Sequence, residues 1–222
     1  MSIPDWISAT SDVVMAGSAI IGVLYAKKWF NQVINEEGTK LSLKLLEQTF
    51  PDLIESLNKR PGQHQYLSFI ADECIKGNYI NNKETLDWFI DEFISNAKEF
   101  KRHRVDLLIC MGALERRGFN LLAKKKSLVI HILAACASLE ILLDEAYDLI
   151  SLIRIKSSAS STMFDVMRHN RYGSNDYDSD TLLQMLKGKC VEMDNLQSEC
   201  YRDYTEFVSG DPHISSFFLK VK

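Results

Sequence analysis

Three closely spaced aspartates are the first residues of this chain that could do chemistry. Asp176, Asp178 and Asp180 occupy positions 1, 3 and 5 of a segment that begins like a calcium-binding EF-hand loop. Such a loop also needs a glycine at position 6 and a glutamate at position 12, where this chain has Thr181 and Lys187. We therefore predict no calcium site, and we expect these aspartates to cap a helix that begins near Asp180.

The histidines and cysteines do not form a metal-binding pattern. The five histidines are scattered, and the five cysteines contain no C-x-x-C pair. Cys74, Cys110 and Cys136 lie in apolar helical contexts, where a free cysteine behaves as a small hydrophobe. No phosphate-binding glycine loop or serine nucleophile motif is present either. The sequence predicts reduced thiols and points to no catalytic residue, cofactor or metal.

The first element that the sequence predicts is an apolar segment near the N-terminus. It covers Ile7–Ala26, and its only charge is Asp12. A helix of this length spans about 30 Å, the thickness of the hydrocarbon layer of a bilayer. No Lys or Arg precedes Lys27, whereas Lys27 and Lys28 follow at once, and this asymmetry places the C-terminal side in the cytoplasm. We predict a single-pass membrane protein with most of its chain cytoplasmic. A buried or interfacial helix and a cleaved signal peptide are the alternatives.

Two features of this segment suggest what it does in a membrane. Ser18, Gly22 and Ala26 share one helix face, and such spacing of small residues lets two helices approach closely in lipid. It predicts a homo-oligomer, unless it reflects ordinary use of small residues. Asp12 either marks the membrane boundary or is a functional intramembrane group, because an unpaired carboxylate in hydrocarbon is costly.

The rest of the chain has the composition of a packed helical domain. Apolar residues make up 46% and charged residues 25%, and the net charge of −4 does not suggest bulk binding to nucleic acid. We predict an all-α fold, an N-terminal membrane helix followed by a cytoplasmic helical bundle, without useful strands. The predicted regions are a membrane helix with its cytoplasmic extension (1–37, ending at Gly38), a short helical connector (38–60), the bundle (61–210) and a tail (211–222). The predicted helices of the bundle and its surroundings cover residues 64–76, 83–98, 99–117, 119–156, 161–170 and 180–209.

A second apolar helix is predicted around Leu128–Leu143, which contains only His131 and Glu140 as titratable groups. Such a helix can be the central strut of a soluble bundle. Alternatively it is a second membrane-active helix, with His131 and Ser138 facing a pore or a partner. Glu140 lies roughly opposite His131 on the helix, which argues against a pore lined by one polar stripe.

Basic residues gather between positions 98 and 126, where nine Lys and Arg face only three acids. They can pair with the acidic C-terminal helix, bind anionic lipid headgroups, or contact a nucleic acid or nucleoprotein. The tail 211–222 likewise either packs on the bundle or docks to a partner. The basic patch consists of Lys101, Arg102, Arg104, Arg116, Arg117, Lys124, Lys125 and Lys126.

The combination of Val13–Ala26 with Leu128–Leu143 resembles the membrane effectors of bacterial antiphage (abortive-infection) systems, such as retron-associated proteins with two hydrophobic helices. The resemblance implies that the membrane is a bacterial inner membrane. It also implies a regulatory partner, protein or nucleoprotein, that restrains the chain until its release damages the membrane lipid layer. The alternative is an adaptor, whose membrane anchor holds a bundle that recruits a cytosolic protein or nucleoprotein.

Overall fold

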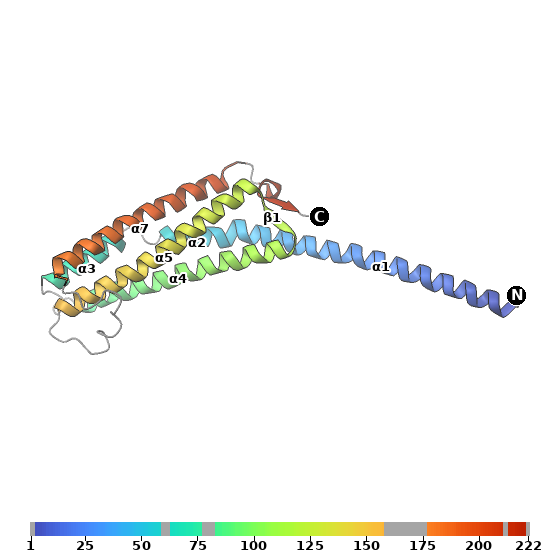
Figure 1. Ribbon diagram of the computed structural model, residues 1–222, viewed down its shortest axis with the longest axis horizontal. Coiled ribbons are helices and arrows are strands. Elements are labelled where there is room, and N and C mark those ends of the chain that lie inside the picture. Colours follow the sequence, from blue (N-terminus) through green and yellow to red (C-terminus); the bar gives the residue numbers. More distant parts are fainter. Residues whose placement is uncertain (1–2, 59–62, 77–82, 158–176, 211–212, 221–222) are drawn as a thin grey trace.

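The helices of this protein pack lengthwise into an elongated bundle, and one of them leaves the bundle as a long rod (Figure 1). The computed structural model describes residues 3–58, 63–76, 83–157, 177–210 and 213–220. Side chains are described from residue 21 onward, except at 58, 63–65, 83, 154–157 and 220. The described part is helical apart from turns and two strands of three residues each. The prediction of an all-α fold is confirmed at this level.

The rod is helix α1 (Ile3–Lys44), which runs without a break into the bundle. The prediction that a helix ends at Gly38 is wrong. Gly38 lies inside α1 and is buried, and a Cβ atom placed on it would come within 2.1 Å of the Phe119 ring. The glycine is therefore explained by a close approach of another segment and not by a helix end.

A π-helical turn (η1, Leu45–Thr49) joins α1 to helix α2 (Phe50–Asn58). Within it the Phe50 amide donates to the carbonyl of Leu45, five residues back. Pro51 gives the physical reason, because proline has no amide to donate to the Glu47 carbonyl and its ring clashes with that group in a regular helix. The wider turn keeps the chain helical at a position where a proline usually ends or kinks a helix.

The remaining helices form the bundle, and two of the predicted ones are confirmed to within a residue at each end. The predicted helix 161–170 lies outside the described residues. The predicted helices 83–98 and 99–117 are one continuous helix, since neither glycine nor proline interrupts the chain between them. The helices are α3 (Gln63–Ile75), α4 (Lys83–Arg116), α5 (Ala123–Ser157) and α7 (Ser179–Val208).

Helix α7 begins as the sequence predicts. Asp178 is its N-cap, and its carboxylate accepts a hydrogen bond of 2.7 Å from the Thr181 amide. This bond satisfies a backbone donor in the first turn of the helix, which has no partner within the helix itself. An aspartate of the acidic segment thus serves as a helix cap, whereas Asp176 lies outside the described residues.

Two short strands close the end of the bundle from which α1 emerges. Gly118, with a φ of 77°, turns the chain after α4 into strand β1 (Phe119–Leu121). The tail forms a 3-10 turn (Ile214–Ser216) and strand β2 (Phe218–Lys220), which pairs antiparallel with β1. The prediction that a helix begins at residue 119 is wrong by four residues, because backbone pairing with the distant tail competes with helix formation there. The tail packs back on its own chain.

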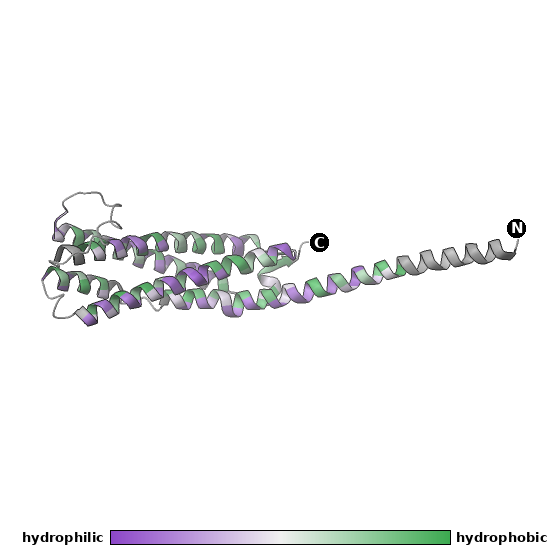
Figure 2. Ribbon diagram, turned by 90° about the horizontal axis from the view of Figure 1, so that it is seen from below, coloured by the Kyte–Doolittle hydropathy of each residue, from purple (hydrophilic) through white to green (hydrophobic). Residues whose placement is uncertain are grey.

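One continuous hydrophobic core holds the bundle together, and helix α5 contributes to it from Leu128 to Ile153. Helix α7 lies beside α5 and also reaches α2, where the Gln197 amide donates to the Leu57 carbonyl at 2.9 Å and the Tyr201 hydroxyl donates to Ile54 at 3.3 Å. Figure 2 shows that apolar residues also occur on α1 beyond the bundle, where no core covers them. This exposed apolar stretch of α1 is the candidate functional surface.

Candidate membrane anchor and its junction with the bundle

Helix α1 exposes an unusual run of large apolar side chains outside the bundle. Every residue from 21 to 32 is exposed. Scattered exposed apolar residues are normal on a protein surface, but a continuous apolar stretch marks a surface that contacts protein or membrane. The large apolar members are between 56% and 71% exposed, and they are Ile21, Val23, Leu24, Tyr25, Trp29 and Phe30.

The structure describes two of the three residues of the predicted helix-packing face, Gly22 and Ala26. Gly22 and Ala26 are exposed, and a Cβ atom on Gly22 would meet nothing within 4 Å. The side chains of Ser18 and Asp12 lie outside the described residues, as does most of the predicted membrane span. In the part that is described, this face of α1 is open to another helix.

The base of α1 is held tightly where it enters the bundle. Gly38 is packed against the ring of Phe119, and the Ser42 hydroxyl, itself buried, donates to the Gly38 carbonyl at 2.9 Å. An ion pair of 3.1 Å joins Glu37 of α1 to Arg117 at the end of α4. Helix α1 is therefore attached to the bundle by packing and by charge.

A cysteine adds a further contact to this junction. The Cys110 thiol of α4 donates to the Leu41 carbonyl of α1 at 3.7 Å. Burial raises the pKa of the Cys110 thiol, although the nearby Lys44 ammonium opposes the shift. The thiol is accordingly protonated at neutral pH and acts as a weak donor and a packing group.

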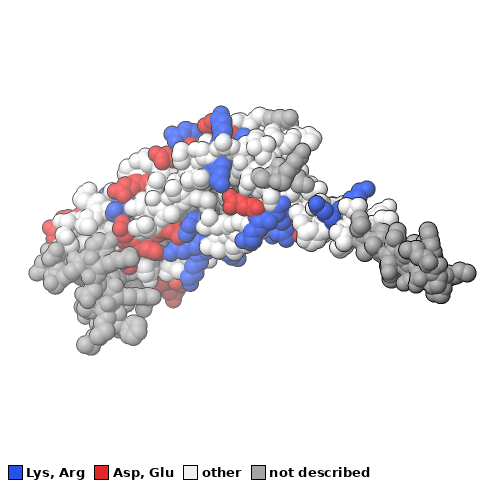
Figure 3. Space-filling model, turned by 45° about the vertical axis from the view of Figure 1, so that its right-hand side comes forward, with Lys and Arg blue, Asp and Glu red and all other residues white. Residues whose placement is uncertain are grey.

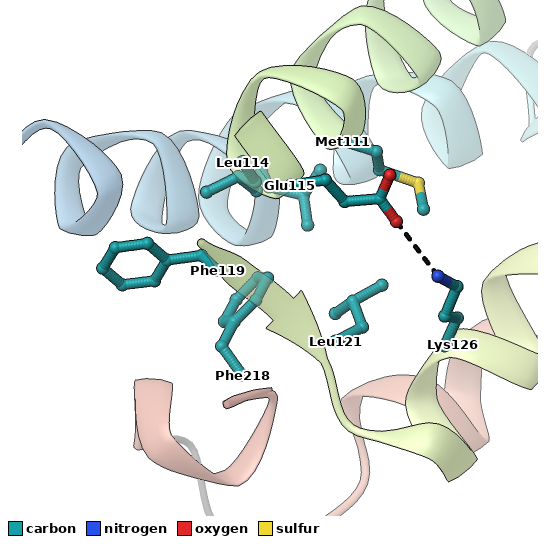
Figure 4. Close-up of a pocket in the computed structure, with 8 residues that line it drawn as sticks. Met111, Leu114, Glu115, Phe119, Leu121, Lys126 and Phe218 are labelled. Carbon is teal, nitrogen blue, oxygen red and sulfur yellow. Dashed lines mark hydrogen bonds and ion pairs between the residues drawn. The ribbon is translucent and has the colours of Figure 1, made fainter. Parts of the chain in front are cut away.

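The two strands cover the next layer of the junction, which Figure 4 shows in detail. Phe119, Leu121 and Phe218 converge there on α4, and an ion pair of 3.0 Å links Glu115 to Lys126 beside them. The cavity between these side chains measures only about 10 Å³. Such a space holds one water molecule at most, so the junction is a structural joint and not a ligand pocket.

The cations of the predicted basic patch are largely paired within the protein. Lys101 lies 2.9 Å from Asp144, and Arg104 binds Glu140 through two hydrogen bonds of 2.5 and 3.0 Å, so both pairs join α4 to α5. The hydrogen bond to Glu140 raises the pKa of Arg104. Because these acids lie on α5, the expected pairing with the acidic C-terminal helix does not apply to this part of the patch.

That expectation holds at the other end of the patch, beside the end of α7. Lys124 pairs with Glu206 of α7 at 3.0 Å. Lys125 donates to the carbonyls of Phe207 and of Ser209, the latter at 3.1 Å, and its ammonium lies 4.9 Å from the Phe217 ring centre. Its pKa is lowered by burial. Lys125 thus supplies the donors that the last carbonyls of a helix lack.

The remaining patch residues lie on the surface. Arg102 is 3.9 Å from Glu99 one turn earlier, and Arg116 is exposed at the end of α4. Figure 3 shows Lys and Arg side chains gathered beside the point where α1 leaves the bundle. Since Lys101, Arg104 and Lys124 are already paired with acids, the charge available to an external anion is smaller than the sequence count suggests.

The second apolar helix has the character of a central strut. His131 and Ser138 of α5 are exposed, whereas Glu140 is half-buried against Arg104. Among the described residues, Ala123–Ile153 is the one stretch long and apolar enough to cross a membrane, with a mean hydropathy of 1.8. A core helix passes the same test, and the apolar side of α5 is the bundle core. This criterion of length and hydropathy does not cover residues 1–20.

The described residues offer no cluster of three or more His, Cys, Asp or Glu side chains that could hold a metal ion. Sequence reasoning missed the residues that form the joint itself, Gly38 and Phe119, because nothing local links positions so far apart.

Comparisons of this chain with protein-family models, with curated proteins and with solved structures find no match.

Proposed function

We propose that this chain is a membrane-anchored adaptor, in which α1 crosses the bilayer and the bundle is presented to a cytosolic protein or nucleoprotein partner. The observation that carries the proposal is the apolar stretch of α1 that no part of the bundle covers. Burying one large apolar side chain is favourable by about 1.5–3 kcal/mol, so several such residues together favour hydrocarbon over water.

Charge and aromatic residues give the anchor a direction. Lys27 and Lys28 follow the apolar run, and Tyr25 and Trp29 beside them are the residues favoured at a membrane interface. Ten residues separate Lys28 from Gly38, which is about 15 Å of helix. That spacing holds the bundle clear of the headgroups and leaves its sides accessible to a partner.

The structure of α5 favours an adaptor over a protein with two membrane-active helices. Leaving the bundle would expose the core face of α5 and separate Glu140 from Arg104 and Asp144 from Lys101. An unpaired carboxylate in hydrocarbon adds a further cost of several kcal/mol. Helix α1 needs no such rearrangement to meet a membrane.

Carbonate extraction of membranes from cells that express the full chain tests the anchor. We expect the wild type to stay in the membrane pellet. Replacing Ile21 and Leu24 together by Arg should move it to the soluble fraction, since an Arg costs about 2.5–3.5 kcal/mol at the centre of a membrane helix and less near its end. The control is Ile141→Arg on α5, where the side chain is 58% exposed on the bundle. Wild-type protein found in the supernatant would refute the anchor.

A membrane-damaging effector of antiphage defence is the second candidate, favoured by the open face around Gly22 and Ala26. In this mechanism a regulatory partner restrains the chain, and its release lets copies of α1 associate in the membrane. Overexpression should then collapse the membrane potential, and Gly22→Leu should prevent it. Gly188→Leu on α7 is the matched control, because a Cβ atom there also meets nothing within 4 Å. The adaptor predicts instead that overexpression leaves the potential intact.

A further inference from the structure

Two cysteines from the neighbouring helices α5 and α7 face each other in the core of the bundle. Cys136 of α5 and Cys200 of α7 are both completely buried, and their sulfur atoms lie 4.0 Å apart. Both are free thiols. The Cys200 sulfur is also 4.0 Å from the Ile132 carbonyl, which fixes its position beside α5.

We propose that Cys136 and Cys200 form a redox-modification site, which a peroxide oxidises to a disulfide that ties α5 to α7. A disulfide bond measures about 2.05 Å between its sulfur atoms, so each sulfur has to move by only about 1 Å. A disulfide also requires the two Cα atoms to lie within about 7 Å of each other, so the helices have to adjust together with the two side-chain rotamers. The proposal does not depend on the membrane anchor, because both residues belong to the bundle.

The two thiols are in hydrogen-bond contact, which shifts their pKa values in opposite directions. A hydrogen bond from the Cys136 thiol lowers the pKa of Cys200, and the same bond together with burial raises the pKa of Cys136. The thiolate is the nucleophile in such reactions. With the Cys136 thiol as donor, Cys200 attacks first, and the same disulfide results if the two residues exchange roles.

The chemistry then proceeds in two balanced steps. The Cys200 thiolate attacks one oxygen of hydrogen peroxide, the O–O bond breaks, and the sulfur becomes a sulfenic acid while the leaving hydroxide takes up the proton of the thiol as water. The Cys136 sulfur next attacks the Cys200 sulfur and displaces its hydroxyl group, which leaves as a second water with the Cys136 proton. Overall, two thiols lose two electrons and two protons to one peroxide.

Burial sets the pace of this reaction and the durability of its product. Neither sulfur is accessible in the closed bundle, so a peroxide reaches Cys200 only when α5 and α7 separate locally. Once formed, the disulfide prevents that separation and is itself shielded from reductants. A brief exposure to peroxide thereby leaves α5 and α7 covalently linked after the peroxide is gone.

The test uses the full chain, purified in detergent under reducing conditions, freed of reductant and incubated with hydrogen peroxide below its melting temperature. Peptide mapping should find a single crosslink that joins the peptides containing Cys136 and Cys200, with the loss of two hydrogen atoms. The loop closed between these positions should raise the melting temperature by about 5–10 °C, and dithiothreitol added after unfolding should reverse the change.

Single variants keep the test specific to this pair. Cys136→Ala and Cys200→Ala should each abolish both the crosslink and the rise in melting temperature, whereas Cys190→Ala, a buried cysteine of the same helix α7, should retain them. The proposal is overturned if the folded wild type keeps both thiols free after prolonged peroxide treatment, or if its crosslinks join other cysteines. Should an alanine variant fail to fold, the mapping of the wild type decides alone.

Discussion

Arg104 and Glu140 illustrate how single residues of this chain were given their roles by neighbours distant in sequence. Their side chains are only 22% and 15% exposed, and two hydrogen bonds join them. Removing one partner of such a pair leaves the other charge desolvated and without its bonds, which costs more than the pair contributes as a whole. An exposed pair such as Lys101 with Asp144 carries no comparable penalty, because water replaces the lost partner.

This contrast gives a prediction at the residue scale. Glu140→Ala should lower the free energy of unfolding by about 1–3 kcal/mol, since the Arg104 guanidinium remains half-buried without its partner. Asp144→Ala, whose carboxylate is 55% exposed, should change it by less than about 1 kcal/mol. Chemical denaturation followed by circular dichroism measures both. If both variants lower the free energy of unfolding equally, burial of the Arg104–Glu140 pair does not contribute to stability.

At the scale of elements, the joint between α1 and the bundle depends on how a helix glycine and a strand phenylalanine fit together. Glycine normally weakens a helix by about 1 kcal/mol relative to alanine. At Gly38 this cost is offset by the packing of the Phe119 ring where a Cβ atom would otherwise sit. The joint thus places strand β1, and with it the tail, against the base of α1.

Gly38→Ala should therefore destabilise the protein by about 1–3 kcal/mol despite the better helix propensity of alanine, because the Phe119 ring has to move. Gly112→Ala on α4 is the matched control. Its Cβ atom would meet only an Arg116 side-chain nitrogen at 3.5 Å, so this variant should be neutral or up to about 1 kcal/mol more stable. Thermal melts of the two variants check the opposite signs, and a stabilised Gly38→Ala protein would contradict the proposed fit.

The tail offers a second element whose role can be measured. Phe217 is 4% exposed and contacts Phe207 of α7, whereas Leu219 in the adjacent strand is 57% exposed. Phe217→Ala should lower the free energy of unfolding by about 3–5 kcal/mol through loss of buried surface and the cavity that remains. Leu219→Ala should lie within about 0.5 kcal/mol of the wild type. If the two variants melt alike, the tail does not form part of the core.

The molecule as a whole combines a compact bundle with a helix that extends far beyond it. Helix α1 has 42 residues and is therefore about 63 Å long. Its contacts with the bundle begin around Val33 and Ile34, which are half-buried, and are complete at Leu45, which is fully buried. The extended part of α1 and the part that packs in the bundle belong to one continuous helix.

A chain that begins at Gln32 should accordingly be a soluble, monomeric bundle, because it lacks the exposed apolar run but keeps all contacts of α1 with the core. A chain that begins at Leu46 loses Leu45 and the packing of Gly38 against Phe119. Its melting temperature should be lower by more than about 5 °C, since one fully buried leucine alone is worth about 2–5 kcal/mol. Gel filtration and thermal melts of the two truncated chains provide the comparison.

What the sequence determined by itself was set by residues that act on near neighbours. The helical class, the cap at Asp178 and the two apolar stretches follow from periodicity and short-range hydrogen bonds. These interactions involve residues a few positions apart, so their outcome depends little on the rest of the fold.

The tertiary structure decided everything that depends on residues brought together from far along the chain. Gly38 lies within a helix because Phe119 packs on it, residues 119–121 form a strand because the tail pairs with them, and Lys101 and Arg104 pair with α5 because α4 lies beside it. In each case a local preference is worth a fraction of a kcal/mol to about 1 kcal/mol, and burial or pairing against a distant partner exceeds it. The contrast between the covered α5 and the exposed stretch 21–32 of α1 has the same origin, since both are apolar helix and they differ in what surrounds them.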